Sequence, residues 1–423
     1  MKVLVVGGGG REHALVWKIA QSPKVDRIYC APGNAGIAAC AELVPLSAES
    51  IPDLMAFAQR EAVDLTVVGP EAPLIAGIAD EFAANGLRVF GPSRQAARLE
   101  GSKVFCKNLF RRHRIPTADY QVFDCPKEAA KYVRARGVPI VIKADGLAKG
   151  KGVVVAHDLD TALEAVDDML VKKTFGSAGD RVVVEECLVG HELSLKVFTD
   201  GESIVPMEPA RDYKRAHDRD EGPNTGGMGA YSPVPLVSRD VANTAIRTVV
   251  RPIVDALRSE GIRYRGVLYA GLMLTNSGLK ALEVNCRFGD PETQVIIPRL
   301  GSDLVDVLLA TCEDRLAEVV VDWSSRAAVC VVLASRGYPA SAETGIPVHG
   351  LEAAGAMDDV VVFHAGTSRG TDGAIVTDGG RVLGVTAWGD SLGAARKRAY
   401  EAASHVQFDG MQYRKDIAAG VTQ

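Results

Sequence analysis

The first hundred residues alternate short apolar runs with helical patterns, and this alternation limits the fold more than any other feature of the sequence. Strands are expected at Lys2–Val6, Arg27–Cys30, Leu65–Val68 and Arg88–Phe90. Helices are expected at Arg11–Gln21 and Leu74–Asn85. Such alternation is typical of a parallel, doubly wound sheet. The turns that follow the strands carry glycine, proline and polar residues, so ligands are expected at that edge.

A glycine loop, Gly7–Gly10, joins the first strand to the first helix. Bare backbone amides and a helix N-terminus attract anions, so we expect a phosphate-bearing small molecule there. A dinucleotide cofactor is the rival interpretation. It needs a third glycine, where Glu12 or His13 stands, and an acid after the second strand, which ends instead in Cys30–Gly33. A loop that only turns tightly stays open as an alternative.

A second glycine-rich loop follows the predicted strand Val138–Lys143. Three lysines and three glycines fall within the ten residues from Lys143 to Gly152. Such a loop is expected to form a mobile cationic flap that closes over phosphates and excludes water. The Walker pattern GxxxxGK[ST] is absent from it. The alternative is a solvated turn with surface lysines.

A later strand ends in acids, at Glu185 and Glu186. An extended segment of this kind can offer main-chain donors and acceptors to an adenine edge, and Glu192 can reach ribose hydroxyls. On its own, the pair of acids is equally compatible with a solvated strand end.

The predicted strand Leu279–Arg287 carries the most informative polar pattern. Side chains alternate along a strand, so Glu283, Asn285 and Arg287 are expected on one face and Leu282, Val284 and Cys286 on the packed face. A carboxylate and an amide oxygen suit Mg²⁺, which prefers one or two protein oxygens together with phosphates. An arginine beside them can hold a carboxylate with two hydrogen bonds. The alternative is an amphipathic edge strand. After it, Asp290 is expected to cap a helix.

Length and composition limit the number of domains and the class of protein to which these motifs belong. The 423 residues suggest about three domains. The net charge of −5 gives no basic field for nucleic acid or anionic membranes, and no apolar run reaches the roughly 18 residues of a spanning helix. Eight scattered cysteines fit a reduced, cytoplasmic protein. We expect domains at 1–101, 102–325 (with a lid subdomain at about 121–190) and 326–423, and a polar loop at Pro209–Pro233.

Taken together, the motifs resemble the ATP-grasp ligases, and within them the glycinamide ribonucleotide synthetase family (phosphoribosylamine–glycine ligases). The resemblance covers essentially the whole chain. It is carried by GGGGREHAL (Gly7–Leu15), PGNAG (Pro32–Gly36), GPEAPL (Gly69–Leu74), KADGLAKGKG (Lys143–Gly152), RDYK (Arg211–Lys214), GPNTGGMGAYSP (Gly222–Pro233) and LEVNCRFGDPETQ (Leu282–Gln294).

The resemblance implies an α/β and α+β multidomain fold. A doubly wound parallel-sheet domain would be followed by an ATP-grasp domain with a mobile lid and by a small C-terminal α+β domain. It also implies a reaction in which glycine and 5-phosphoribosylamine are joined at the expense of ATP, with Mg²⁺ or Mn²⁺, through a glycyl phosphate. These small molecules would be the partners, without nucleic acid or membrane, and the protein would be a monomer or weak homo-oligomer.

The site residues follow from the same resemblance. Metal ligands would be Glu283 and Asn285. Catalytic residues would be Lys143, Asp212, Arg287 and Asp290. The ATP site would comprise Lys103, Lys143, Lys149, Gly150, Lys151, Glu185, Glu186, Leu188 and Glu192. The substrate site would comprise Gly9, Gly10, Arg11, Glu12, Asn34, Glu71, Asp212, Lys214, Gly227 and Arg287.

One departure concerns the strand before the metal strand. Many ATP-grasp enzymes place an acid there, but Val267–Met273 has none. Asp212 or Asp290 would then contribute, or the site would have fewer carboxylates. Two other functions stay open: a different ATP-grasp carboxylase or amide ligase, and a nucleotide-binding protein without catalysis. Likewise, the C-terminal domain would either complete the adenosine pocket or brace the central domain.

Overall fold

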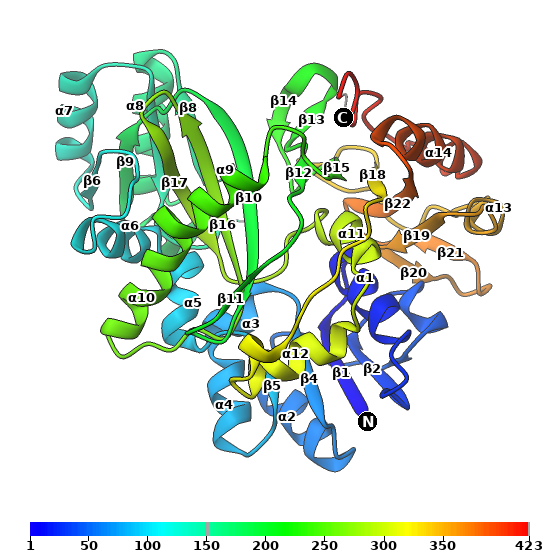
Figure 1. Ribbon diagram of the computed structural model, residues 1–423. Coiled ribbons are helices and arrows are strands. Elements are labelled where there is room, and N and C mark those ends of the chain that lie inside the picture. Colours follow the sequence, from blue (N-terminus) through cyan, green and yellow to red (C-terminus); the bar gives the residue numbers. More distant parts are fainter. Residues whose placement is uncertain (149–151, 422–423) are drawn as a thin grey trace.

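The computed structural model describes residues 1–148 and 152–421, and its N-terminal part is built on a parallel sheet. The strand order is β3-β2-β1-β4-β5, and every paired neighbour in it is parallel. The strands are β1 (Lys2–Gly7), β2 (Arg27–Pro32), β3 (Glu42–Leu43), β4 (Leu65–Val68) and β5 (Val89–Phe90). This confirms the predicted doubly wound sheet, which lies at the bottom of the molecule in Figure 1.

The helices around this sheet are α1 (Gly10–Ile19), α2 (Ile51–Arg60), α3 (Glu71–Ala76), α4 (Ile78–Ala84) and α5 (Arg94–Gly101). The single helix predicted over Leu74–Asn85 is wrong. Gly77 adopts a left-handed conformation, with φ of +98°, and so divides this stretch into α3 and α4. Because α3 begins at Glu71, that side chain projects from a first helical turn near the carboxyl edge of the sheet.

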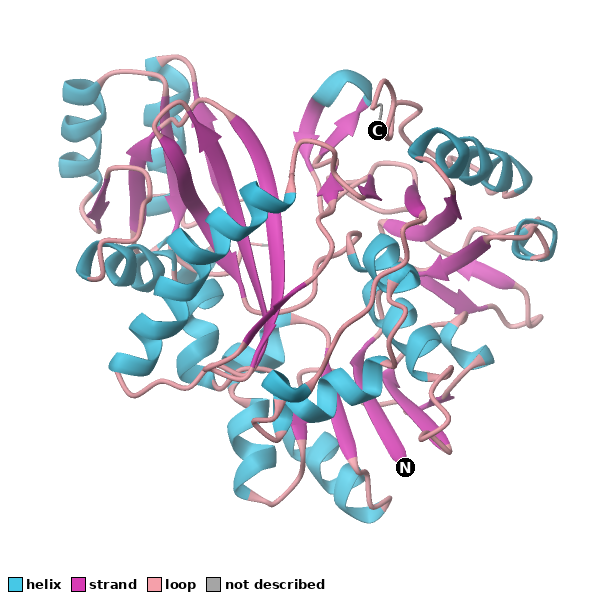
Figure 2. Ribbon diagram, in the orientation of Figure 1, coloured by secondary structure: helices cyan, strands magenta, loops and turns pink. Residues whose placement is uncertain are grey.

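The central part contains two antiparallel sheets. The first lies within residues 120–186 and has the order β6-β9-β7-β8. Its elements are β6 (Tyr120–Phe123), β7 (Ile140–Ala144), β8 (Val153–Ala156), β9 (Val182–Glu186), α7 (Pro126–Arg136) and α8 (Leu159–Leu170). Apolar residues of both helices and of β7 and β9 form one buried cluster, and Figure 2 shows the helices on the outer side of the sheet.

The second central sheet has the order β11-β10-β16-β17. Its strands are β10 (His191–Thr199), β11 (Ile204–Pro206), β16 (Gly266–Thr275) and β17 (Gly278–Asn285). The accompanying helices are α6 (Lys103–Arg112), α9 (Arg239–Ala245), α10 (Arg251–Ser259), α11 (Thr293–Ile296) and α12 (Leu304–Cys312). A π-helical turn, Ile246–Val250, joins α9 to α10, so one continuous helical segment runs from Arg239 to Ser259.

The polar segment Pro209–Pro233 is not the predicted loop. It contains β12 (Arg211–Asp212), β13 (Arg215–His217), β14 (Glu221–Asn224) and β15 (Gly229–Ser232). Strands β12 and β15 extend a sheet of the C-terminal part, in the order β12-β15-β18-β22-β19. Residues on both sides of position 326 therefore share one sheet. Local periodicity did not show these strands because their pairing partners are distant in sequence.

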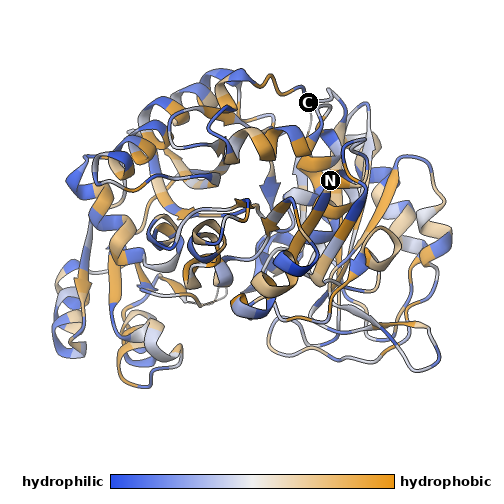
Figure 3. Cartoon of the chain, turned by 90° about the horizontal axis from the view of Figure 1, so that it is seen from below, coloured by the Kyte–Doolittle hydropathy of each residue, from blue (hydrophilic) through white to orange (hydrophobic). Residues whose placement is uncertain are grey.

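The remaining C-terminal elements are β18 (Ala327–Ala334), β19 (Val360–His364), β20 (Thr367–Arg369), β21 (Ile375–Thr377), β22 (Arg381–Gly389), α13 (Leu351–Gly355) and α14 (Leu392–His405). One face of the sheet packs on α14 through a buried apolar cluster. Figure 3 shows apolar residues concentrated on the strands of the molecule and polar residues on the outer turns. No described helix has the length and apolar character needed to cross a lipid bilayer.

Candidate active site

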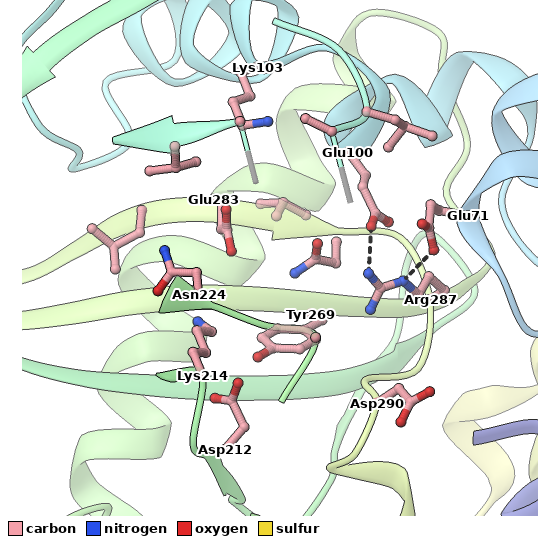
Figure 4. Close-up of a pocket in the computed structure, with 18 of the residues that line it drawn as sticks. Glu71, Glu100, Lys103, Asp212, Lys214, Asn224, Tyr269, Glu283, Arg287 and Asp290 are labelled. Atoms are coloured by element: carbon pink, nitrogen blue, oxygen red, sulfur yellow. Dashed lines mark hydrogen bonds and ion pairs between the residues drawn. The ribbon is translucent and has the colours of Figure 1, made fainter. Parts of the chain in front are cut away.

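A cavity of about 580 Å³ lies between the three parts of the chain. It is continuous in its lining with a second cavity of about 600 Å³, because residues such as Lys143, Asp212 and Glu283 line both. Figure 4 looks into the first cavity and shows acidic and basic side chains from several elements pointing toward the same space. Ten of the predicted site residues that the structure describes line this first cavity, although they are spread along the sequence from Arg11 to Asp290.

Strand β17 forms one wall, and a β-bulge changes how its side chains alternate. Gly271 of β16 pairs with Glu283, whereas the next residue, Leu272, pairs with Ala281. Leu282 is therefore the extra residue, and it lines both cavities instead of packing with Val284 as predicted. Ala281 takes the buried place. The bulge leaves Glu283, Asn285 and Arg287 lining the first cavity together, as the spacing predicts.

Glu283 lies in a field of positive charge. Burial alone raises the pKa of its carboxyl, but nearby cations outweigh burial and hold that pKa below its usual value. These cations are Lys214, Lys143, Lys103 and Arg287. None of the described residues forms an ion pair or hydrogen bond with the Glu283 carboxylate or the Asn285 amide. Among the described residues, these two side-chain oxygens therefore have no hydrogen-bond or ion-pair partner, although several cations lie nearby.

The lysine at the end of β7 is held by a buried carboxylate. Lys143 and Lys107 both form ion pairs with Glu185 of β9. Burial lowers the pKa of Lys143, but Glu185 and then Glu283 overcome this effect and raise it above its usual value, so the ammonium is retained. Lys107 also donates to Thr117 Oγ1 at 2.7 Å, and Thr117 donates to the Ala281 carbonyl of β17 at 2.6 Å. These contacts join β9 to β17, the strand that carries Glu283.

The other predicted ATP residues fall into three groups. Lys103 lines the first cavity, and burial lowers the pKa of its ammonium. Glu185, Glu186, Leu188 and Glu192 line the second cavity. Lys149, Gly150 and Lys151 lie outside the described residues.

Within the second group, the side chains have different partners. Glu186 pairs with Lys280 at 2.9 Å and accepts from the Asp119 amide at 3.1 Å. Glu192 lies 3.9 Å from the Lys214 ammonium. Leu188 lines the same cavity together with Val141 and Val155, so this wall also offers apolar side chains to a planar ligand.

Arg287 stands between two acids from the N-terminal part. Its Nε lies 3.2 Å from Glu71, and its Nη2 lies 2.9 Å from Glu100. Nη1 donates to the Phe288 carbonyl at 3.2 Å. Figure 4 shows this arrangement, with the guanidinium flanked by both carboxylates. A guanidinium has five N–H groups, so two remain for a ligand in the cavity.

A second charged cluster lies where β10, β12 and β16 approach each other. Lys196 is buried, lies 3.1 Å from Glu292, and is 4.0 Å from the ring centre of Tyr269. Asp212 lines both cavities, and burial raises the pKa of its carboxyl despite the nearby Lys214 ammonium. Attraction to Asp212 in turn raises the pKa of Lys214. The two predicted substrate residues Asp212 and Lys214 are therefore brought together.

At Gly9 the glycine loop differs from the prediction of bare amides. The Gly9 amide donates to Glu12 at 2.6 Å, and Glu12 also pairs with Arg11 at 2.5 Å. Glu12 thus caps the helix that Gly10 begins, because a carboxylate at the third helical position can accept from the residue before the helix. Of this group only Arg11 lines the cavity, and its Nη1 donates to Phe288 at 3.3 Å.

The Asn34 side chain also stabilises the glycine loop. Its amide nitrogen donates to Gly8 and His364, and its oxygen accepts from Gly36 and Ile37, at 2.8 to 3.0 Å. The buried side chain is fully occupied by backbone groups. It fixes the loop geometry, and a direct substrate contact stays a prediction.

Asp290 is paired on both oxygens and is not the predicted helix cap. Gln294 donates to its Oδ1 at 2.8 Å, and Arg381 lies 3.2 Å from its Oδ2. Helix α11 begins only at Thr293. Gly227 lies in a turn that packs on Pro291, with φ of +113°. A side chain at that position would meet Pro291 Cδ at 2.4 Å.

Several residues of this site were not among the predicted site residues, including Glu100, Lys107, Tyr338 and Arg381. Lys107 and Glu100 occur in helical patterns where acids and lysines are ordinarily exposed. Tyr338 and Arg381 come from the C-terminal part and line only the first cavity. The expectation that the C-terminal part completes the adenosine pocket therefore finds no support in the described lining of the second cavity.

The donor set fits Mg²⁺ held in part by a ligand. Glu283 and Asn285 supply two oxygens, and the described residues contain no cluster of three or more histidines, cysteines or acids that could hold a metal by themselves. Magnesium commonly takes one or two protein oxygens and completes its shell with phosphate and water. Such an arrangement can bind a triphosphate, neutralise its charge and place it beside a carboxylate held by Arg287.

Comparisons with known proteins agree along the whole chain. Models of the N domain, the ATP-grasp (A) domain and the C domain of phosphoribosylglycinamide synthetase match residues 1–100, 101–293 and 328–420. A curated phosphoribosylamine–glycine ligase from Caldanaerobacter subterraneus subsp. tengcongensis is 51% identical over 420 residues, covering 99% of this chain and 100% of the relative. Its counterpart from Escherichia coli K12 is 52% identical over 423 residues, covering 99% and 98%.

Comparison with solved structures supports the same family and the same fold. The crystal structure of phosphoribosylamine–glycine ligase from Thermotoga maritima matches with a TM-score of 0.85 and 34% identity, covering 99% of this chain and 100% of that one. A biotin carboxylase–β,γ-ATP complex from Campylobacter jejuni matches with a TM-score of 0.72 but only 13% identity, covering 97% and 92%. The latter similarity concerns the fold alone.

Proposed function

The chain belongs to the phosphoribosylglycinamide synthetase family, and from this premise we propose that it joins glycine to 5-phosphoribosylamine in the second step of purine biosynthesis. ATP would phosphorylate the glycine carboxylate, and the phosphoribosylamine amino group would attack the resulting glycyl phosphate. The products are glycinamide ribonucleotide, ADP and phosphate. Full-length similarity to ligases of this name supports the reaction.

The observation that carries the proposal is the continuous pair of cavities. One end offers Glu186, Leu188 and Glu192 to a nucleoside, and the other contains Arg287 between two acids. Glu283 and its surrounding lysines lie between these ends. A nucleoside at the first end would therefore direct its phosphates toward an acid bound at the second.

The lysines would hold the triphosphate. Lys103 and Lys143 face the same space as Glu283, and Lys143 keeps its charge through Glu185. Glu283 and Asn285 would hold Mg²⁺ or Mn²⁺. The metal supplies charge neutralisation for phosphoryl transfer when bound. Positioning and charge compensation are the main requirements of such a transfer.

Arg287 would hold the glycine carboxylate with its two remaining N–H groups, while Glu71 and Glu100 orient the guanidinium. Asp212 and Lys214 would contact substrate near the transfer point, together with Gly227. The segment Gly9–Glu12, with Asn34 and Glu71, would form the wall around phosphoribosylamine. Asp290 would act through its position beside this wall, because both its oxygens are already paired.

Water must be kept from the intermediate, since an acyl phosphate hydrolyses readily. The loop 144–152, including Lys149, Gly150 and Lys151, would cover the phosphates. We further propose domains at 1–101, 102–325 and 326–423, a lid at about 121–190, a cytoplasmic location, and a monomer or weak homo-oligomer without nucleic-acid or membrane partners.

The activity is tested by measuring ADP and phosphate release with a panel of acids and amines. Phosphoribosylamine is generated in the assay from ribose 5-phosphate and ammonia. The proposal predicts ADP release that needs glycine, and an amide product, identified by mass, that needs both substrates. Release of ADP with another acid, such as bicarbonate, and not with glycine would contradict it.

A further inference from the structure

The C-terminal part reaches the active-site cavities at one end only. Tyr338, Pro339 and Arg381 line the first cavity, which also contains Arg11 and Asp290. The described lining of the second, nucleotide-side cavity ends in the chain at Glu283. The C-terminal residues are therefore placed to affect the end where the acid and the amine meet, and not the nucleoside.

Arg381 bonds to two backbone segments at this end and is linked to a third through Asp290. Its Nη1 donates to the Gly226 carbonyl at 2.7 Å and to the Asp290 carbonyl at 3.1 Å, and its Nη2 lies 3.2 Å from the Asp290 carboxylate. Asp290 in turn accepts from Gln294, whose amide lies against Gly10 at the start of α1. One guanidinium thus connects the glycine turn, the segment after Arg287 and the first helix.

Tyr338 holds the same turn from the other side. Its phenol oxygen accepts from the Gly226 amide at 2.9 Å. Its own O–H donates to none of the described residues, although a phenol can both accept and donate. Because Tyr338 lines the cavity, this donor is available to a ligand.

The turn leaves little space for another conformation. A side chain at Gly226 would meet Arg381 Cζ at 3.0 Å, and one at Gly227 would meet Pro291 Cδ at 2.4 Å. The turn, Pro291 and Arg381 therefore fit each other closely. Loss of Arg381 would release the turn, and with it the wall of the cavity on this side.

We propose that Arg381 and Tyr338 are positioning residues for the second half of the reaction, in which the amine displaces phosphate from the acyl phosphate. This inference rests on the proposed function. In that step the amine nitrogen forms a bond to the carbonyl carbon, the bond from that carbon to the phosphate oxygen breaks, and the nitrogen loses a proton. The first half, in which ATP phosphorylates glycine, does not depend on these residues.

Hydroxylamine allows the two halves of the reaction to be measured separately. It is a small nucleophile that converts an acyl phosphate into a hydroxamate without a bound ribose phosphate. Arg381→Met is expected to lower amide formation from phosphoribosylamine by about 100-fold, which is the usual effect of a small misplacement of reacting groups. Glycine-dependent hydroxamate formation should stay within about threefold of the wild type, and the KM for ATP should not change.

Two further variants test the same inference, and a third serves as a control. Arg381→Lys should recover part of the lost amide formation because it keeps the charge but not the forked donors. Tyr338→Phe should lower amide formation about tenfold, equivalent to the loss of one hydrogen bond, and spare the hydroxamate. Arg326→Met is the matched control, because Arg326 also pairs with an aspartate, Asp359 at 2.6 Å, but away from the cavities.

Equal loss of hydroxamate and amide in Arg381→Met would overturn the inference, as would unchanged amide formation in both Arg381→Met and Tyr338→Phe. If Arg381→Met fails to fold, Tyr338→Phe decides by the same two products. A wild-type enzyme that formed neither product would overturn the proposed function, and the inference with it.

Discussion

At the scale of single residues, β17 shows what local spacing can predict. Glu283, Asn285 and Arg287 line one cavity, as alternation along a strand requires. The residues that pair with these side chains cannot be predicted from local spacing. Glu100, which pairs with Arg287, is 187 residues away in the chain, and only the packing of α5 against β17 brings the two together. The side chains proposed to carry the chemistry line the cavity as local spacing predicts, but local spacing did not predict the residues that orient them.

Glu283→Gln tests the central carboxylate. Glutamine keeps the shape but removes the charge that balances the surrounding lysines and would bind the metal. We expect turnover to fall at least ~100-fold, as for the loss of one main electrostatic contact in an active site. ATP binding should survive, because the nucleoside wall is unchanged. Steady-state ADP release and ATP titration by calorimetry measure the two effects.

The control for this variant is Glu164→Gln on the exposed surface of α8. It should keep full activity. Undiminished turnover in Glu283→Gln would show that this carboxylate is not needed for phosphoryl transfer.

At the scale of elements, turns and short strands determine how the site is closed. The Gly226–Gly227 turn lies between β14 and β15, in a segment that the sequence predicted to be a loop. Its shape is set by contacts with Pro291, Tyr338 and Arg381 rather than by its own residues alone. Strands of two to four residues carry too little periodicity to be recognised before their partners are known.

Gly227→Ala is expected to disturb this turn. Both a positive φ and a contact of 2.4 Å with Pro291 oppose the added methyl group. Gly278→Ala is the matched control, because Gly278 has φ of +106° but nothing within 4 Å of the added Cβ. Gly278→Ala should cost about 1 kcal/mol of stability with normal activity.

Gly227→Ala should cost about 2–3 kcal/mol and also lower amide formation. Urea unfolding and the amide assay measure both effects. Equal stability losses in the two variants would mean that the contact with Pro291 does not constrain the turn.

The elements themselves were largely predictable. The parallel sheet and several strands of the central part, among them β7 and β17, follow from the pattern of apolar residues. Three local features were not predictable from the sequence. The break at Gly77, the bulge at Leu282 and the late start of α11 each depend on a backbone conformation or a tertiary contact that residue pattern does not reveal.

At the scale of the whole molecule, the first and last parts of the chain are in direct contact. The His13 ring of α1 accepts at Nδ1 from the His364 amide of β19 at 2.8 Å, and it packs edge-on against Phe363. Burial lowers the pKa of His13 to about 3 and that of His364 to about 4, from the usual 6.5. Neutral histidines therefore pack at the junction between the glycine loop and the C-terminal sheet.

This junction predicts a pH dependence of stability. Because the folded-state pKa values lie below 6.5, the unfolded chain binds protons between pH 6.5 and about 4 that the folded chain does not. Stability from these groups is complete above pH 6.5 and falls as the pH decreases through that window. Each histidine contributes a slope of about 1.4 kcal/mol per pH unit.

His13→Asn removes the contribution of one histidine to the pH dependence of stability, and it keeps an acceptor for the His364 amide. Urea unfolding between pH 4.5 and 7 should show a shallower loss of stability toward low pH than in the wild type. His157→Asn, at an exposed position, should leave the slope unchanged. An unchanged slope in His13→Asn would mean that His13 has the same pKa in the folded and the unfolded protein.

The central claim is that one continuous site activates glycine as an acyl phosphate and then transfers it to an amine. Glycine labelled with ¹⁸O in both carboxylate oxygens tests this claim most directly. If the carboxylate attacks the γ-phosphorus of ATP and phosphate leaves from the acyl carbon, one ¹⁸O must appear in the released phosphate and one must stay in the amide. Mass spectrometry of both products measures this distribution. Phosphate without ¹⁸O, alongside normal formation of the amide, would contradict the account.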